Sequence, residues 1–379
     1  MKIVIAIDSL KGSLSSLQAG DAIREGIHNA MKDAEVFVRP LADGGEGTVE
    51  ALTLGMGGQL QKVSVCGPLG KPVDAEYGIL NDGKTAIMEM SAAAGIIFLK
   101  DDELNPLHTT TFGVGEMILD AIRKGCRHFI MGIGGSATND GGIGMLQALG
   151  YGILDENGNQ VPYGATGLSK IVKITEDTVV PQLKECDFKI ACDVDNPLCG
   201  ENGASAIYGP QKGATPSMIM QMDEWLKNFA TLTHEKYEKA DRLIPGTGAA
   251  GGLGFAFLSY TNAVLESGIS IVLKETKLEE YVKDADLVVT GEGKLDAQTV
   301  MGKAPIGVAN IAKKYGKPVI AFSGVVSKDA VAVNEHGIDA FFPILRRVAT
   351  RDEAMSYAIA RQNMVDTAEQ VFRLIEAVR

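Results

Sequence analysis

Hydrophobic residues near the amino terminus follow first a strand period and then a helix period. Residues 2–7 form a short apolar run that ends at Asp8, and residues 35–39 form a second run. Between them, Ser15 and Gln18 have the spacing of a capping box, and apolar residues then recur at helical intervals. The pattern predicts a strand, a helix and a strand, which is typical of a parallel sheet.

The carboxyl-terminal part repeats this alternation. Residues 286–290 predict a strand, GEGKLDAQT after them a loop, and residues 317–324 a further strand. A helix is expected to begin near Pro305, because proline is favoured in a first turn. The chain closes with an apolar stripe that predicts one long amphipathic helix, whose start Thr350 and Glu353 cap.

The middle of the chain shows strand-like runs around turn signals. Residues 75–90 predict a hairpin about an Asn-Asp-Gly turn, and residues 151–162 a second hairpin. We therefore predict an α/β protein of two domains. Residues 1–80 plus 283–379 form a discontinuous, Rossmann-like domain with a doubly wound, mostly parallel sheet, and residues 81–282 form an inserted mixed α/β domain.

Length and composition agree with two globular domains. The chain has 379 residues, of which 45% are hydrophobic and 22% charged, and these proportions exclude a disordered protein. The net charge of -12 argues against nucleic acid or an anionic membrane as the main partner. No apolar run reaches the length of a membrane span, and the first residues lack the pattern of a secretory signal. We expect a cytoplasmic protein with reduced cysteines.

Residues 78–85, GILNDGKT, match the phosphate-binding pattern G-x-x-x-x-G-K-[ST]. That loop must follow a strand and enter a helix, so that its amides and the helix N-terminus converge on phosphate. Here the match spans the Asn-Asp-Gly turn and precedes a β-prone run. We interpret it as part of the hairpin and expect no phosphate at Lys84 and Thr85.

Two glycine patterns leave a dinucleotide site as an alternative. GIGGSA at 132–137 follows a strand, whereas GTGAAG at 246–251 follows Pro245. A dinucleotide fold also needs an acidic residue about 20 residues on, at the end of the next strand, for which Asp155 and Glu156 are the candidates. An NAD-dependent hydroxyacid oxidoreductase is therefore an alternative function.

The main chemical signal is a series of loops that mix glycine with carboxylate, hydroxyl or lysine residues, most of them at expected strand ends. Lysines and amide-rich turns suit phosphates, and carboxylates suit metal binding and proton transfer, which are the parts that phosphoryl transfer needs. In chain order the loops are DSLKGS (8–13), ADGGEGT (42–48), GIGGSATNDGG (132–142), ACDVDNPL (191–198), GPQKGAT (209–215), GTGAAGGLG (246–254) and TGEGKLDAQT (290–299).

Together with GKAPIGVA (302–309), and in this order, these motifs resemble the bacterial glycerate kinase family, which includes the glycerate 2-kinases of glyoxylate and glucarate metabolism. The resemblance covers essentially the whole chain. It implies ATP-dependent, Mg²⁺-dependent phosphorylation of D-glycerate, at the 2-hydroxyl to give 2-phosphoglycerate and ADP, with 3-phosphoglycerate as the alternative product. It also implies one α/β domain inserted in another, and we expect the reaction in the cleft between them. Ile7, Leu10, Thr247 and Lys294 depart from the residues that are usual in the family.

On this reading, each loop has an expected role. The candidate catalytic residues are Lys11, Asp43 and Asp296, with Asp43 the first choice for the general base and Asp296 the second. Substrate is expected at Asp8, Ser9, Lys11, Glu46 and Lys294, with its carboxylate near Lys11. Nucleotide is expected at Gly134, Gly135, Ser136, Thr138, Asn139, Asp140 and Lys212. Asp193 and Asp195 are expected to hold Mg²⁺, because residues two apart on an extended segment point to one side. The expected partners are D-glycerate and ATP, and the chain is expected to be a monomer or a homodimer.

Overall fold

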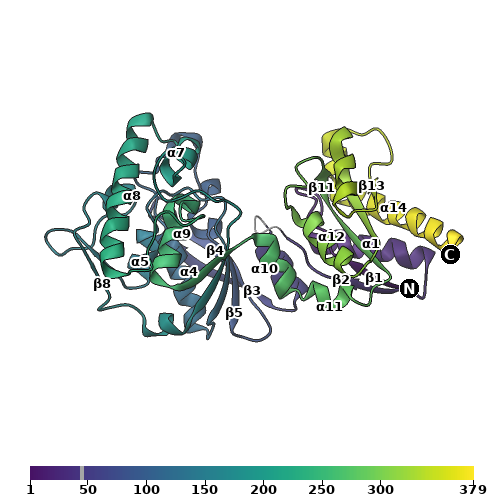
Figure 1. Cartoon of the computed structure of the whole chain (residues 1–379), viewed down its shortest axis with the longest axis horizontal. Coiled ribbons are helices and arrows are strands. Elements are labelled where there is room, and N and C mark those ends of the chain that lie inside the picture. Colours follow the sequence, from purple (N-terminus) through teal and green to yellow (C-terminus); the bar gives the residue numbers. More distant parts are fainter. Residues whose placement is uncertain (43–46) are drawn as a thin grey trace. The chain divides into compact units, whose positions relative to one another are not determined.

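The computed structural model describes residues 1–42 and 47–379, and the chain divides into two compact units (Figure 1). Unit 1 comprises Met1–Asp43, Glu50–Met56 and Ile269–Arg379, and unit 2 comprises Gly44–Val49 and Gly57–Gly268. Unit 1 is therefore built from both chain ends. The domain boundaries expected near residues 80 and 283 stay a prediction, which limited proteolysis would test.

Unit 1 contains a five-stranded, wholly parallel sheet in the order β13-β12-β11-β1-β2. Its strands are β1 (Lys2–Ile5), β2 (Glu35–Val38), β11 (Leu287–Leu295), β12 (Val319–Val326) and β13 (Ala340–Pro343). Counted along the chain, this is the doubly wound order 2-1-3-4-5. Its switch point lies between β1 and β11, where ligands bind at the carboxyl ends of the strands.

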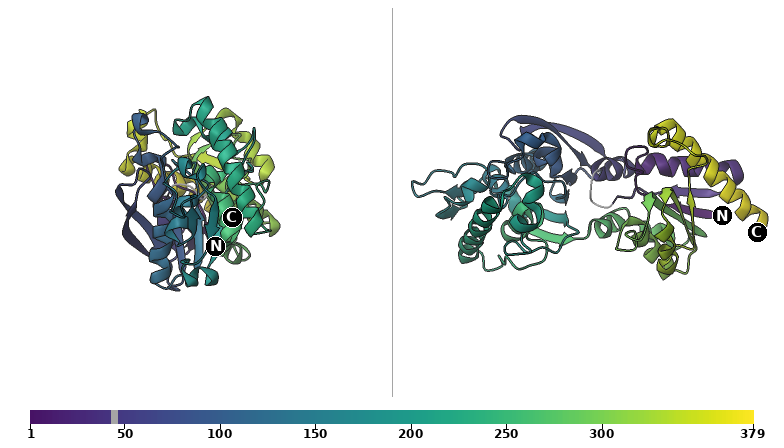
Figure 2. Two further views of the ribbon diagram at one scale, coloured as in Figure 1. Left: turned by 90° about the vertical axis from the view of Figure 1, so that its left-hand side faces the viewer. Right: turned by 90° about the horizontal axis from the view of Figure 1, so that it is seen from above.

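Helices cover both faces of this sheet. α1 (Ser16–Ala30) and α14 (Tyr357–Val378) lie side by side in Figure 2 and share one apolar cluster with the strand residues Ile3, Ile5 and Val289. Val4 and Val288 alternate with those residues and are fully buried on the opposite face, which α12 (Ala304–Lys314) covers. The remaining helices are α2 (Thr48–Gly55), α10 (Gly268–Glu275), α11 (Leu278–Val282) and α13 (Arg351–Met355).

Two elements of unit 1 differ from the expected ones. β11 continues to Leu295 through the expected loop, because it stays paired with β12 as far as Leu295↔Val326. The expected long terminal helix is broken at Ser356, whose backbone is extended and which is the N-cap position of α14. The predicted capping boxes at Ser15 and Thr350 are both confirmed.

Unit 2 contains a mixed six-stranded sheet in the order β10-β9-β6-β5-β4-β3. The four strands from β10 to β5 are parallel, and Glu266, Ala191, Gly132 and Glu89 form one row at their carboxyl ends. The bounds of these strands are β3 (Gln59–Cys66), β4 (Pro72–Ile79), β5 (Thr85–Glu89), β6 (His128–Gly132), β9 (Asp187–Ala191) and β10 (Asn262–Glu266). Loops that follow the parallel strands therefore meet at one edge of the sheet.

A second, two-stranded sheet pairs β7 (Gly152–Leu154) with β8 (Lys173–Thr175) in antiparallel fashion. The expected hairpin at residues 151–162 reduces to one bridge between Leu154 and Gln160, because β7 pairs with β8 instead. The helices of unit 2 are α3 (Ser91–Ala94), α4 (Phe112–Arg123), α5 (Ile143–Ala148), α6 (Ala165–Leu168), α7 (Ala204–Tyr208), α8 (Pro216–Lys236) and α9 (Ala249–Tyr260). The predicted fold class, a parallel α/β domain from both chain ends with a mixed α/β domain inserted, is confirmed.

Candidate active site

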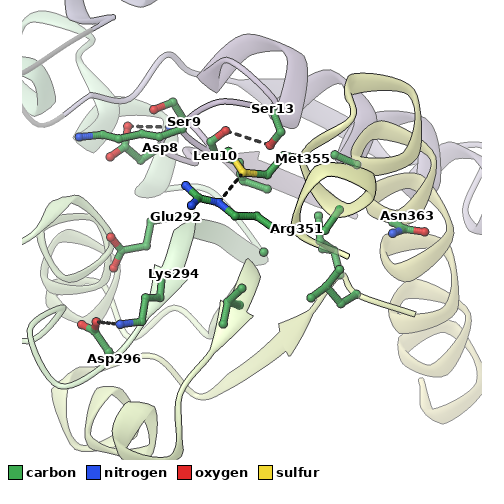
Figure 3. A pocket seen from close by; sticks show the side chains of 18 of the residues that line it. Asp8, Ser9, Leu10, Ser13, Glu292, Lys294, Asp296, Arg351, Met355 and Asn363 are labelled. Carbon is green, nitrogen blue, oxygen red and sulfur yellow. Dashed lines mark hydrogen bonds and ion pairs between the residues drawn. The ribbon is translucent and has the colours of Figure 1, made fainter. Parts of the chain in front are cut away.

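A cavity of about 760 Å³ opens at the switch point of unit 1 (Figure 3). The loop after β1 and the end of β11 contribute most of its polar lining. The charged and hydroxyl residues around it include Asp8, Ser9, Lys11, Glu292, Lys294, Asp296, Lys303 and Arg351. The neighbouring positions of β1 and β11 thus bring together loops that are far apart in the sequence.

The loop after β1 is held to the neighbouring strand and to α13. The amide of Asp8 donates to the carbonyl oxygen of Gly291 at 2.9 Å, and the amide of Ser9 donates to Oδ1 of Asp8 at 2.7 Å. Gly12 has a φ of +80°, and a Cβ there would clash with the end of the Met355 side chain. Only glycine fits this turn without strain. Asp8 and Ser9, which precede the turn, line the cavity.

Glu292 is the most enclosed carboxylate of the β11 segment. Only 9% of the residue is exposed, and burial raises the pKa of its carboxyl above the ordinary value. Oε1 accepts a hydrogen bond from Thr299 Oγ1 at 2.6 Å, and Lys303 Nζ lies 3.7 Å from Oε2. The sequence placed Glu292 in a loop, whereas it lies within β11.

Asp296 has the opposite electrostatic environment. Lys294 Nζ lies 2.9 Å from its Oδ2, and this hydrogen bond lowers the pKa of Asp296 below its ordinary value. The same contact raises the pKa of Lys294. Asp296 Oδ1 accepts from the amide of Gln298 at 3.0 Å, and Lys303 lies 3.9 Å away. Asp296 is therefore ionised at neutral pH.

The cavity has more cations than carboxylates. Lys11, Lys294, Lys303 and Arg351 face the three carboxylates Asp8, Glu292 and Asp296, so the site favours an anion although the whole chain carries -12. Sequence reasoning missed Arg351, since it lies in no glycine-rich loop. Its only signal is the Thr350–Glu353 capping box, which fixes where α13 begins.

In unit 2, the predicted nucleotide loop follows β6. Gly134 and Gly135 are exposed and Ser136 is 8% exposed, whereas Thr138, Asn139 and Asp140 are fully buried. Asp140 accepts from the amide and hydroxyl of Thr111 and from the amide of Gly142. Burial raises the pKa of its carboxyl. The accessible part of the loop is thus Gly134 and Gly135, with Ser136 exposed only slightly beside them, and the buried residues hold the loop backbone.

Lys212 is buried behind this loop. Its Nζ donates to Ser136 Oγ at 2.8 Å and to the carbonyl oxygen of Thr138 at 2.6 Å, and only 2% of the residue is exposed. Burial lowers the pKa of Lys212 to about 7, and the charge of Asp140 opposes this shift. The two hydrogen bonds from Lys212 therefore connect the loop after β6 to the segment at residues 210–212, on the buried side of the loop.

The glycine-rich segment 246–252 packs against the back of the same loop. Gly251 has a φ of +69°, its carbonyl oxygen accepts from the amide of Gly141 at 2.9 Å, and a Cβ there would clash with the carbonyl oxygen of Thr138. The glycines allow two backbones to approach closely. Close packing of the two backbones therefore accounts for the glycines of the GTGAAG pattern, and no bound dinucleotide is needed to explain them.

Asp193 and Asp195 are exposed and follow β9, and they line a second cavity of about 380 Å³ with Glu266. Asp193 Oδ1 accepts from the amide of Gly268 at 3.1 Å. Within residues 1–42 and 47–379, no three His, Cys, Asp or Glu side chains are placed to hold a metal ion. Two exposed carboxylates without a cage fit Mg²⁺ that is held mainly by water and phosphate oxygens.

Asp43 and Glu46 lie outside the described residues. The GILNDGKT interpretation is confirmed, since β4 and β5 form an antiparallel hairpin. Asp82 Oδ1 accepts hydrogen bonds from the amides of Lys84 and Thr85 at 2.8 and 2.9 Å. The amides that a phosphate would need are therefore used by a carboxylate of the same turn. Asp155, a candidate for the dinucleotide pattern, follows β7, which lies outside the parallel sheet. The dinucleotide pattern after β6 therefore lacks its required context.

The structure is that of an α/β protein with a cation-rich cavity at the switch point of one sheet. In unit 2, an amide-rich loop and two carboxylates follow the neighbouring strands β6 and β9 at one sheet edge. The model of the glycerate kinase family matches residues 3–376. A glycerate kinase from Haemophilus influenzae is 48% identical over 375 residues, which are 99% of each chain. A glycerate 2-kinase from Escherichia coli is 48% identical over 354 residues, 93% of each chain. A crystal structure from Salmonella typhimurium described as a glycerate kinase 2 has a TM-score of 0.92 and 45% identity, with 100% of this chain and 98% of that chain covered.

The chain belongs to the glycerate kinase family and is therefore an enzyme of the kinase class. In the described part of the chain, no helix is long and apolar enough to cross a membrane.

Proposed function

We propose that the protein transfers the γ-phosphoryl group of ATP to the 2-hydroxyl of D-glycerate, giving 2-phosphoglycerate and ADP. The observation that carries the proposal is the unit 1 cavity. It combines an excess of cations with carboxylates and a serine hydroxyl at a switch point, as a small hydroxy acid requires. Choice of the 2-hydroxyl is supported by the name of the Escherichia coli relative, a glycerate 2-kinase.

The substrate contacts in unit 1 follow from the chemistry of the lining groups. Asp8 and Ser9 would hydrogen-bond the hydroxyls of glycerate, and Lys11 and Lys294 would attract its negative charge. Glu46 is a further proposed contact. Asp296 is kept ionised by Lys294, so it can accept the proton of the attacking hydroxyl; Asp43 is the alternative base.

The nucleotide contacts follow from the loop after β6. The backbone of Gly134 and Gly135 and the hydroxyl of Ser136 would bind phosphate oxygens. Thr138, Asn139, Asp140 and Lys212 would act from behind, by fixing the course of this loop.

The Mg²⁺ ion that accompanies ATP would be held by Asp193 and Asp195. When bound, it neutralises charge on the phosphate oxygens. Both carboxylates follow β9, in register with the end of β6, so they lie at the same sheet edge as the nucleotide loop. The expected interdomain cleft, cytoplasmic location and monomeric or homodimeric state remain predictions.

The first test is ADP release from ATP and Mg²⁺ with and without D-glycerate. Release that depends on both Mg²⁺ and glycerate supports the proposal. Glycerate-independent release, or none, would count against it. Nicotinamide absorbance with NAD and glycerate tests the alternative oxidoreductase, and we expect no change.

A further inference from the structure

One wall of the unit 1 cavity comes from the short helix α13, which carries Arg351 on its cavity side. Arg351 and Met355, one helical turn apart, both line the cavity. Figure 3 shows the guanidinium directed to the part of the cavity where Asp8, Ser9 and Glu292 lie. The end of the Met355 side chain occupies the space above Gly12, so α13 is packed on the turn that presents Asp8 and Ser9.

Arg351 and Lys11 differ from the other two cations of the cavity, because among the described residues neither of them forms an ion pair with a carboxylate. Lys294 pairs with Asp296, and Lys303 lies within 4 Å of Glu292 and Asp296. Among the described residues Arg351 forms no ion pair, and its one hydrogen bond runs from Nε to Met355 Sδ at 3.4 Å. Because a thioether is a weak acceptor, this contact orients the side chain without satisfying its charge. The two terminal nitrogens remain available to a ligand.

We propose that Arg351 binds the carboxylate of the acceptor substrate, an inference that rests on the proposed function. A guanidinium presents two parallel N–H groups that match the two oxygens of a carboxylate, whereas an ammonium is a point charge. Glycerate has one charged group, and Lys294 and Lys303 are already paired with carboxylates. Arg351 then forms the bidentate contact to the carboxylate and selects hydroxy acids over neutral polyols, while the lysines add attraction to the same negative charge.

The test compares Arg351→Gln and Arg351→Lys with wild type, using D-glycerate and its neutral analogue D-glyceramide as acceptors. Arg347→Gln is the matched control, since Arg347 is an exposed arginine of the same segment that does not line the cavity. We expect R351Q to raise KM for D-glycerate about 10- to 100-fold, with KM for ATP unchanged. The preference for D-glycerate over D-glyceramide should fall by the same factor. R351K should be intermediate, because it keeps the charge and loses the fork.

Several outcomes would overturn the inference. R351Q could leave KM for D-glycerate unchanged, or could impair both acceptors equally. It could also raise KM for ATP, which would assign Arg351 to a phosphate. If wild type and R347Q form no phosphoester, the proposed function fails. Calorimetric titration with D-glycerate then decides separately: binding by wild type that R351Q loses supports the carboxylate contact, and equal or no binding overturns it.

Discussion

Two carboxylates at the end of β11, Glu292 and Asp296, have pKa values shifted in opposite directions. Burial raises the pKa of Glu292, whereas the hydrogen bond from Lys294 lowers the pKa of Asp296. A general base must be ionised at the working pH and must reach the hydroxyl that loses its proton. Asp296 meets the first requirement over the whole neutral range.

These shifts give a pH test of the base. If Asp296 is the base, kcat/KM for D-glycerate should stay flat from neutral pH down to the ordinary carboxyl range and fall only below it, because its pKa is lowered. If Glu292 were the base, the fall would begin at higher pH, because its pKa is raised. We expect Asp296→Asn to reduce kcat about 100-fold or more, and Glu292→Gln to cost less. The reverse order would assign the role to Glu292.

Asp193 allows a test of the Mg²⁺ contact. Asp193→Asn keeps the side-chain size and can still accept from the Gly268 amide, so folding should be unaffected. We expect kcat to fall about 100-fold and the Mg²⁺ concentration for half-maximal rate to rise. Asp177→Asn, an exposed aspartate of the same unit, is the control. Turnover near that of the control would remove Asp193 from the metal site.

The buried Lys212, which hydrogen-bonds the loop after β6, is expected to make the free energy of unfolding depend on pH. Its pKa of about 7 in the folded protein lies far below the ordinary lysine value near 10.4 in an unfolded chain. Between these values the unfolded chain binds more protons at this group, so Lys212 makes the free energy of unfolding rise with pH, by at most about 1.4 kcal/mol per unit.

We therefore expect Lys212→Met to flatten the pH dependence of urea unfolding between pH 7 and 9, relative to wild type. The exposed Lys227 on α8 gives the control variant Lys227→Met, which should keep the wild-type slope. An unchanged slope in K212M would mean that the lysine is not buried as described.

At the level of elements, the contact between the 246–252 segment and the loop after β6 depends on glycine. Gly251 and Gly200 both have positive φ, at +69° and +96°, but a Cβ clashes with backbone only at Gly251. Gly251→Ala and Gly200→Ala both place alanine at a positive φ, but only Gly251→Ala also brings the new Cβ into the backbone of the loop after β6. We expect G251A to lower the free energy of unfolding by about 1–3 kcal/mol more than G200A, and to raise KM for ATP. Equal losses would show that the close approach is unimportant.

The elements with local signals could be predicted from the sequence. Capping side chains set the starts of α1, α8 and α13, and the Asn-Asp-Gly turn set the β4–β5 hairpin. The extension of β11 could not be predicted, since its glycine-rich end reads as loop and is held by pairing with β12. The break at Ser356 was hidden because apolar residues continue at helical spacing on both sides of it.

At the scale of the whole molecule, the strand order decides which loops meet. The sequence identified the loops after β1 and β11 as candidate site loops. It did not show that these two strands, which are far apart in the chain, lie next to each other in the sheet. It also could not show that Thr138 to Asp140 and Lys212 are buried, because burial arises from packing against the 246–252 segment. Arg351 was missed because it lies in no glycine-rich loop and lines the cavity only through the tertiary position of α13.

The reaction that we propose is the phosphorylation of D-glycerate at its 2-hydroxyl by ATP. The most direct measurement is a ³¹P NMR spectrum of the product formed from D-glycerate, ATP and Mg²⁺ by the purified full chain. We expect one new phosphomonoester resonance that coincides with added 2-phosphoglycerate, together with ADP. A resonance that coincides with 3-phosphoglycerate would contradict the choice of hydroxyl, and the absence of any glycerate phosphoester would contradict the proposed reaction.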